Sequence, residues 1–265
     1  MALFDTVVVL AILLGCCALG ILIRPFLAER HRSREVIEFV QLVVAMLMTF
    51  VALVLGLLTS SVKSSFDKVG NDLKALAIQV IQLDRSLRVW GPDTQPTRDL
   101  LRAYTAAAIA TTWLREPKPP GDYYPNQVPT NAGSYLESSI MGDMLTRIEV
   151  DIRQLEPHDP MQRRLLTTCI AQFERLMQTR WRLIEETGSS ISLPFYIVLV
   201  FWLAVVFSGF GLTAPRNALS YTTILLGGVS IVSAFFVIQE LDTPFSGLFT
   251  VSSQPLRDAL NHLSQ

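Results

Sequence analysis

The sequence predicts an all-α integral membrane protein, in which four transmembrane helices accompany an intervening helical bundle. The first observation is composition, since 50% of the 265 residues are hydrophobic and only 17% are charged. The second is distribution, because the apolar residues concentrate in four uncharged runs near the two ends of the chain. The third is a helical period of apolar residues in the charged middle. An ordinary soluble domain has neither this composition nor runs of this length.

The four uncharged runs are long enough to cross a bilayer. A helix rises 1.5 Å per residue, so roughly 20 apolar residues cross a hydrocarbon core of about 30 Å. Because the backbone must satisfy its own hydrogen bonds in lipid, each run is expected to be a helix. The runs cover residues 6–23, 39–62, 195–213 and 217–239, which are 18, 24, 19 and 23 residues long.

The first run has two other interpretations, a cleaved signal peptide and a lipoprotein leader. A signal peptide begins with Lys or Arg, and the first basic residue here is Arg24, after the run. The string Leu-Leu-Gly-Cys at 13–16 resembles a lipoprotein cleavage site only loosely. We therefore favour a retained transmembrane helix, in which Cys16 and Cys17 pack as small apolar residues.

Residues 63–192 are charged, unlike the four runs, with 16 basic and 16 acidic residues that balance, and their apolar residues recur at helical spacing. They therefore predict a soluble helical domain. A seam with alternating steps of four and three begins inside the second run and leaves it, which indicates one helix packed against others. We expect the second span to continue as the first helix of the bundle and to end near Trp90-Gly91-Pro92. The seam consists of Leu55, Thr59, Val62, Phe66, Val69, Leu73, Leu76, Val80, Leu83 and Leu87.

Three further helices follow in this domain, over 97–114, from 133 or 134 to 155, and over 161–186. A loop rich in proline and glycine separates the first two, and Glu-Pro-His-Asp-Pro at 156–160 separates the last two. The predicted organisation is therefore transmembrane helices 1 and 2 in 1–62, the soluble domain in 63–192, helices 3 and 4 in 193–240, and a tail with a short amphipathic helix in 241–265.

Motifs that carry chemistry are absent from the sequence. It contains no GxGxxG, GxxxxGK[ST], HExxH or GxSxG. His31, His158 and His262 lie far apart, without acidic or cysteine neighbours at metal-ligand spacing. The net charge of −1 gives no basic field for nucleic acid. We expect no enzymatic activity, no cofactor, no metal and no nucleic-acid partner.

The fourth span carries a face of small or hydroxyl residues at steps of three and four. Small residues let membrane helices approach closely, and a water-lined pathway would also use such a face. Both interpretations stay open, as a pore or a helix-packing surface. Glu240 and Asp242 end the span, where carboxylates oppose the helix dipole by about 0.3–1 kcal/mol each. The face consists of Ser220, Thr223, Gly227, Ser230 and Ala234.

Several strings resemble the bestrophin-like family of bacterial four-span membrane proteins. The strongest are Leu-Asp-Thr-Pro-Phe-Ser-Gly at 241–247 and Val-Ser-Ser-Gln-Pro-Leu-Arg-Asp-Ala-Leu at 251–260. The turn at 210–217 and the exit of the second span at 56–67 are also similar to that family. The resemblance covers essentially the whole chain. It marks as family-motif residues Glu240, Asp242, Pro244, Phe245 and Gly247.

This resemblance implies kinship to true bestrophins, which form pentameric anion channels. It suggests a homo-oligomer in the cytoplasmic membrane, with lipid and inorganic anions as partners. The acidic run of the true bestrophins' calcium clasp is replaced here by Leu-Phe-Thr-Val at 248–251, so calcium gating does not carry over. True bestrophins line their neck with apolar and aromatic residues of the second helix. Phe39, Phe50 and Phe66 lie on that helix, and we interpret them as core packing.

Two alternatives stay open for the side of the membrane that holds the soluble domain, and two for the function. Arginines in the two short loops place those loops in the cytoplasm by the positive-inside rule, whereas the bestrophin kinship places the soluble domain there. An even number of spans puts both termini on the side of the domain. The favoured function is a homo-oligomeric anion channel. The alternative is a membrane-anchored scaffold or sensor whose helical domain binds a partner.

Overall fold

The computed structural model describes residues 2–26, 34–121, 124, 139–187, 193–215 and 217–264. Within these ranges every regular element is a helix, which confirms the all-α class. The chain divides into two compact units. The first consists of Met1–Ser65 and Ser189–Thr243, and the second of Phe66–Gly188 and Pro244–Gln265.

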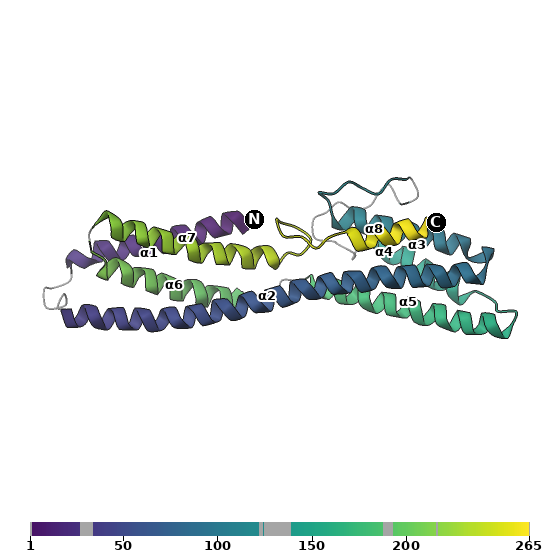
Figure 1. Cartoon of the computed structure of the whole chain (residues 1–265), viewed down its shortest axis with the longest axis horizontal. Coiled ribbons are helices and arrows are strands. Elements are labelled where there is room, and N and C mark those ends of the chain that lie inside the picture. Colours follow the sequence, from purple (N-terminus) through teal and green to yellow (C-terminus); the bar gives the residue numbers. More distant parts are fainter. Residues whose placement is uncertain are drawn as a thin grey trace. The chain divides into compact units, whose positions relative to one another are not determined.

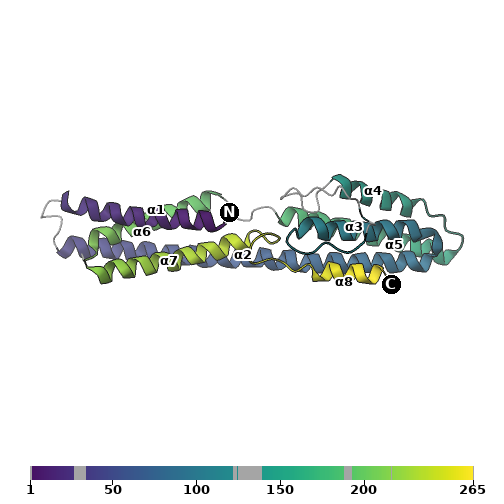
Figure 2. The ribbon, with the colours of Figure 1, turned by 90° about the horizontal axis from the view of Figure 1, so that it is seen from above.

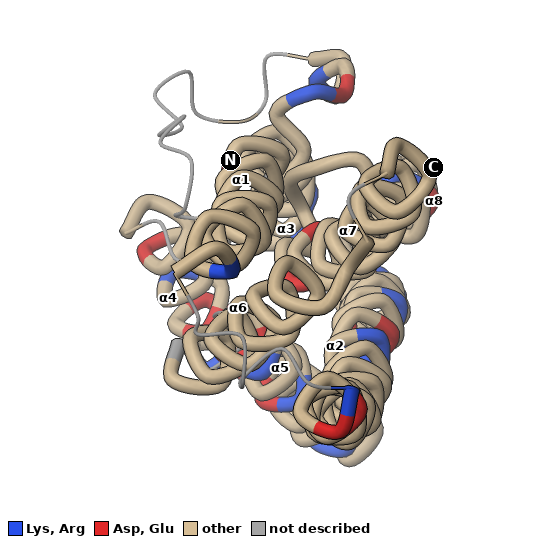
Figure 3. The backbone as a smooth tube through the Cα atoms, turned by 90° about the vertical axis from the view of Figure 1, so that its left-hand side faces the viewer, with Lys and Arg blue, Asp and Glu red and all other residues tan. Residues whose placement is uncertain are grey.

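The first unit holds the membrane-crossing helices. Its α1, α6 and α7 lie alongside the first part of α2 in both ribbon views (Figures 1 and 2). Four helices are long and apolar enough to cross a membrane, as predicted. Figure 3 shows α1, α6 and α7 largely without charge, whereas charged residues gather on α2, α4, α5 and α8. The helices of this unit are α1 (Ala2–Ile23), α6 (Leu193–Thr213), α7 (Ala218–Leu241) and the part of α2 (Arg34–Trp90) that ends at Ser65.

Helices α1 and α6 pack backbone against backbone. A Cβ added at Gly211 would lie 3.1 Å from the Cα of Gly20 and would overlap the carbonyl oxygen of Cys17. A Cβ at Gly20 would likewise overlap the carbonyl oxygen of Ser208. Only glycine permits this approach, and close approach is the main source of attraction between helices in lipid. The contact between Gly20 and Gly211 therefore fixes the crossing of these two spans.

Helix α2 is one unbroken helix of 57 residues (Figure 1). At 1.5 Å per residue it is about 86 Å long, far more than the roughly 30 Å of a hydrocarbon core. The prediction that the second span continues into the bundle is confirmed. The helix ends at Trp90, and Gly91 follows with φ 132°, a left-handed conformation that favours glycine. Seven seam positions are buried, namely Val62, Val69, Leu73, Leu76, Val80, Leu83 and Leu87.

The second unit packs the rest of α2 against α3, α4, α5 and α8 around one hydrophobic core. Asp84 of α2 is buried and accepts hydrogen bonds from Arg98 Nε at 2.8 Å and Arg88 Nη2 at 3.2 Å, which ties α3 to α2. The helices are α3 (Gln95–Thr112), α4 (Ser139–Arg153), α5 (Pro160–Glu186) and α8 (Gln254–Leu263).

The helices of this unit follow the sequence pattern closely. Leu101, Tyr104, Ala108 and Thr111, the predicted face of α3, are all buried. Asp159 caps α5 by accepting the backbone N–H of Gln162 at 2.7 Å. The predicted start of α4 at 133 or 134, and most of the loop before it, lie outside the described residues.

Helix α8 belongs to the core of the second unit. It lies in residues 241–265, which the sequence presents as a tail. Four of its ten residues are buried in the same cluster as α3, namely Leu256, Ala259, Leu260 and Leu263. The segment after the fourth span is thus anchored in the bundle by the apolar contacts of α8.

We predict that Gly211→Ala destabilises the protein, because the new methyl group must push the α1 and α6 backbones apart. Overpacking of this kind costs about 1–3 kcal/mol. Thermal unfolding in detergent measures it. The matched control is Gly15→Ala, since a Cβ at Gly15 meets no heavy atom within 4 Å. Equal stability of the two variants would contradict the close packing.

We predict that Glu186→Gln stabilises the protein at alkaline pH. Burial, and next the carboxylate of Asp72, raise the pKa of Glu186. A raised folded pKa means that charging Glu186 costs stability in full above that pKa, and that the cost declines as pH falls and vanishes below the ordinary pKa of glutamate in the unfolded chain, about 4.3.

The melting temperature of Glu186→Gln should therefore exceed that of the wild type near pH 8 and match it near pH 4, where glutamate is largely protonated. Glu156→Gln, at an exposed position in the segment before α5, is the control. A gain for Glu186→Gln that is independent of pH would contradict this origin.

Candidate functional site

The membrane part of α2 is barely packed against its own chain. In its most apolar stretch only 6% of the residues are buried. The corresponding shares in α1, α6 and α7 are 22%, 33% and 22%. One exposed stripe of large apolar side chains follows this part of the helix, namely Phe39, Leu42, Met46, Phe50, Leu53 and Leu57. This stripe is available to lipid, to another subunit or to a pore.

The exposed stripe corrects an interpretation drawn from the sequence. Phe39 is 65% exposed and Phe50 is also exposed, so core packing within the chain is wrong for both. The physical reason is that an apolar residue of a membrane helix needs no protein core, because lipid is equally apolar. Phe66 is partly buried and packs against the core of the second unit.

The predicted small face of α7 does not pack within the chain. Thr223, Gly227 and Ser230 are exposed, whereas Ser220 and Ala234 are half-buried. The hydroxyl of Thr223 donates to the carbonyl oxygen of Leu219 at 2.9 Å, a bond within the helix. Another face of α7 packs in the unit, through Gly228, Val232, Phe235 and Ile238.

At the end of α7, polar side chains join three spans. Thr6 of α1 donates to Gln239 Oε1 at 3.4 Å, and Gln239 Nε2 donates to the hydroxyl of Tyr196 in α6 at 3.5 Å. Glu240, the residue after Gln239, is buried. Asp242, which follows the last residue of α7, is half-buried. The first two family-motif residues thus lie at the end of the membrane unit.

The other three motif residues lie in the second unit and build a loop. Phe245 packs edge-on against Trp113, with ring centroids 5.3 Å apart and planes at 79°. The carbonyl oxygen of Pro244 accepts the backbone N–H of Val251 at 2.8 Å, which closes the loop. Gly247 has φ 122°, so the loop requires glycine there.

Partners far away in the sequence hold this loop to the end of α3. The indole N–H of Trp113 donates to the carbonyl oxygen of Val251 at 2.7 Å. Arg257 of α8 donates to Glu116 Oε2 at 3.0 Å and to the carbonyl oxygen of Pro117 at 2.8 Å. The buried Ser253 also donates to Glu116. Sequence reasoning missed the roles of Trp113 and Glu116, because no local pattern relates positions about 140 residues apart.

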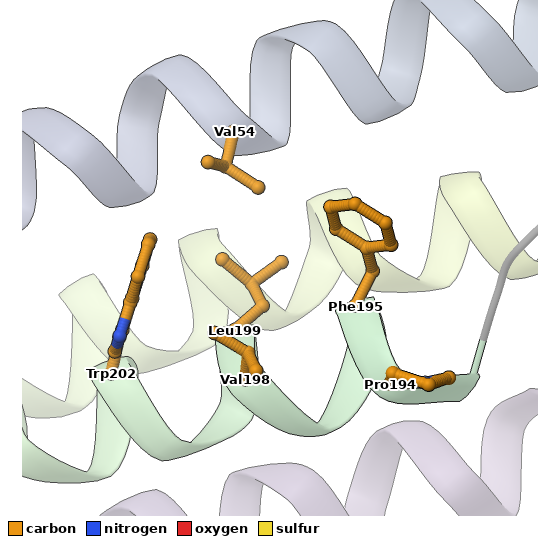
Figure 4. Close-up of a pocket in the computed structure, with 6 residues that line it drawn as sticks. All are labelled: Val54, Pro194, Phe195, Val198, Leu199 and Trp202. Carbon is orange, nitrogen blue, oxygen red and sulfur yellow. The ribbon is translucent and has the colours of Figure 1, made fainter.

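Among the hollows lined by described residues, two stand out, and neither resembles a catalytic site. The first, of about 200 Å³, lies between α2 and α6 and is lined by apolar side chains including Val54, Leu199 and Trp202 (Figure 4). The second, of about 460 Å³, is lined in part by Asp67 and Lys74, which carry charges of opposite sign. Among the described residues no three of His, Cys, Asp and Glu group to hold a metal ion.

We predict that Trp113→Phe loosens the loop at 244–251. The ring contact with Phe245 is largely kept, but the carbonyl oxygen of Val251 loses its donor, at a cost of about 1–3 kcal/mol if it stays buried. Limited proteolysis should cut the variant in this loop faster than the wild type. Trp181→Phe, at an exposed tryptophan in α5, is the matched control. Equal cleavage rates would contradict the role of the indole.

Comparisons with solved structures show the same fold. Three crystal structures of a bacterial bestrophin homologue from Klebsiella pneumoniae, each with a different mutation, match at TM-scores of 0.67, 0.65 and 0.64. Their sequence identities are 16%, 16% and 15%. The matches cover 98%, 100% and 97% of this chain, and 100%, 99% and 97% of those chains.

A comparison with curated proteins gave no match. The family model described as the Bestrophin-like domain, however, matches residues 10–256. This match spans all four membrane helices, the bundle and the start of α8. The chain therefore belongs to the bestrophin-like family.

Proposed function

We propose that the protein is one subunit of a homo-oligomeric anion channel. Membership of the bestrophin-like family and the full-length match to a bacterial bestrophin homologue support this function. The observation that carries it is the membrane part of α2, where only 6% of the residues in the most apolar stretch are buried in their own chain. A span whose large apolar stripe stays exposed beside its own chain is suited to face other subunits and an axis between them.

In this proposal α2 lines the conduction path. Its exposed stripe is apolar, and an apolar constriction can gate a pore because water leaves it readily. The same helix continues into the bundle without a break, so a shift in the second unit has a continuous route to the constriction. By kinship the number of subunits is five.

The small face of α7 is proposed as a contact between helices of neighbouring subunits. Gly227 leaves open space above its Cα, which would admit another helix closely. Since the hydroxyl of Thr223 already bonds within α7, this residue needs no water. These features favour packing over a water-lined path for Ser220, Thr223, Gly227, Ser230 and Ala234.

The proposed location is the cytoplasmic membrane, with both termini on the side of the helical bundle. Helix α8 follows the fourth span, yet it packs in the same core as α3, which follows the second span. Both segments therefore belong to one side of the membrane.

Cysteine substitutions test which helix lines the path. In a background with Cys16, Cys17 and Cys169 replaced by alanine, we predict that Met46→Cys and Phe50→Cys carry chloride currents that a charged methanethiosulfonate reagent blocks. The matched control is Phe201→Cys, an exposed position on α6. Ser230→Cys reports on α7 in the same way.

Block at Ser230→Cys but not at Met46→Cys or Phe50→Cys would contradict the assignment of α2 and favour α7 as the pore surface. Protein that conducts no ions at any voltage, pH or calcium concentration would contradict the channel itself. If such protein instead captured a partner through the bundle, the scaffold or sensor alternative would replace it.

A further inference from the structure

The loop after the fourth span presents two large apolar side chains to solvent. Leu248 is 72% exposed and Phe249 is 46% exposed. We call these two residues, with the adjacent Arg115, the loop tip. Soluble surfaces seldom expose neighbouring large apolar side chains without a function, and such groups mark contact sites for proteins or membranes.

The loop holds these side chains outward, because the residues on both sides of them are fixed. Phe245 is buried against Trp113, and Val251 is buried with its N–H and its carbonyl oxygen both hydrogen-bonded. Gly247 takes the left-handed conformation that turns the chain before Leu248. The exposure of Leu248 and Phe249 is thus a product of a braced loop.

A positive charge accompanies the apolar side chains. Arg115 donates from Nη1 to the carbonyl oxygen of Gly247 at 3.1 Å, which places its guanidinium beside the loop tip. A guanidinium has five N–H donors, and its planar fork suits phosphate oxygens. Lys118 is exposed three residues further along. Glu116, the nearest carboxylate in the sequence, is already paired with Arg257.

The chain limits how far the loop tip can lie from the end of the fourth span. Leu248 follows the end of α7 at Leu241 by seven residues, so a fully extended chain would carry it at most about 25 Å beyond that span. Apolar side chains beside a cation are the combination that binds the headgroup layer of a bilayer.

We propose that the loop tip docks on the membrane surface, where Leu248 and Phe249 enter the headgroup layer and Arg115 binds the phosphate of an anionic lipid. This would anchor the end of α3, and through Arg257 also α8, to the bilayer. The inference is independent of ion conduction, and its test records no current.

The test uses the full-length protein in vesicles, with the three native cysteines replaced by alanine. Leu248→Cys carries an NBD fluorophore, and Met161→Cys, 70% exposed in the first turn of α5, is the control. In vesicles of phosphatidylglycerol and phosphatidylcholine, lipids with a doxyl group near the headgroup should quench the label at position 248 strongly. Iodide in the water should quench it weakly, with the reverse at position 161.

Charge variants then test the role of the cation. Arg115→Gln should lower the equilibrium constant for docking, which lipid quenching at position 248 reports, about fivefold, the effect of one basic residue near an anionic surface. Arg115→Lys keeps the charge and should keep the quenching. Pure phosphatidylcholine should behave like Arg115→Gln, and inorganic phosphate added to it should restore nothing.

Three results would overturn the proposal. Equal iodide quenching at positions 248 and 161, without quenching by doxyl lipid, would show a loop tip that stays in water. Shielding from iodide in detergent as well as in vesicles would show that a second copy of the chain covers it. Shielding by inorganic phosphate in phosphatidylcholine would show a phosphate site without a lipid.

Discussion

Helix α2 is one continuous helix whose first part suits lipid and whose second part packs in a soluble bundle. The rest of the structure depends on that constraint. In hydrocarbon the backbone can pair only with itself, so α2 has to be helical across the membrane, and it then continues into the bundle as the same helix. What changes along this unbroken helix is whether its apolar side chains are exposed or buried. The large apolar residues of the stripe from Phe39 to Leu57 are exposed, whereas the seam residues from Val69 to Leu87 are buried in the core of the second unit.

The other helices respond to this change of solvent in different ways. In the membrane unit α1 and α6 approach through Gly20 and Gly211, because attraction in lipid comes from close packing. In the bundle unit, burial of apolar side chains drives packing, and polar ties such as Asp84 with Arg98 fix its register. One chain thus uses two kinds of helix packing, and α2 takes part in both units.

Patterns that depend on neighbours along the chain were predictable from the sequence. The four spans follow from run length, the continuity of α2 from the seam between Leu55 and Leu87, and its end from Gly91. Contacts over long distances were not predictable. Nothing local in Trp113, Glu116 or Arg257 indicates that they meet. The direction of Phe39 and Phe50 also escaped prediction, since hydropathy is the same whether a side chain meets lipid, a pore or a core.

The family-motif residues acquire a physical role that links the two units through the chain. Pro244, Phe245 and Gly247 shape a loop that the end of α3 holds, and this loop follows the fourth span in the chain. Helix α2 and this loop are thus two described segments through which the chain passes between the units. In the proposed channel, both would pass a change in the bundle to the pore.

The measurement that tests this account most directly is the reversal potential of the purified protein in a planar bilayer under a chloride gradient. An anion channel predicts currents whose reversal potential follows the chloride equilibrium potential and ignores replacement of the cation. Currents that follow the cation gradient, or a bilayer that stays silent at every voltage, pH and calcium concentration, would contradict it.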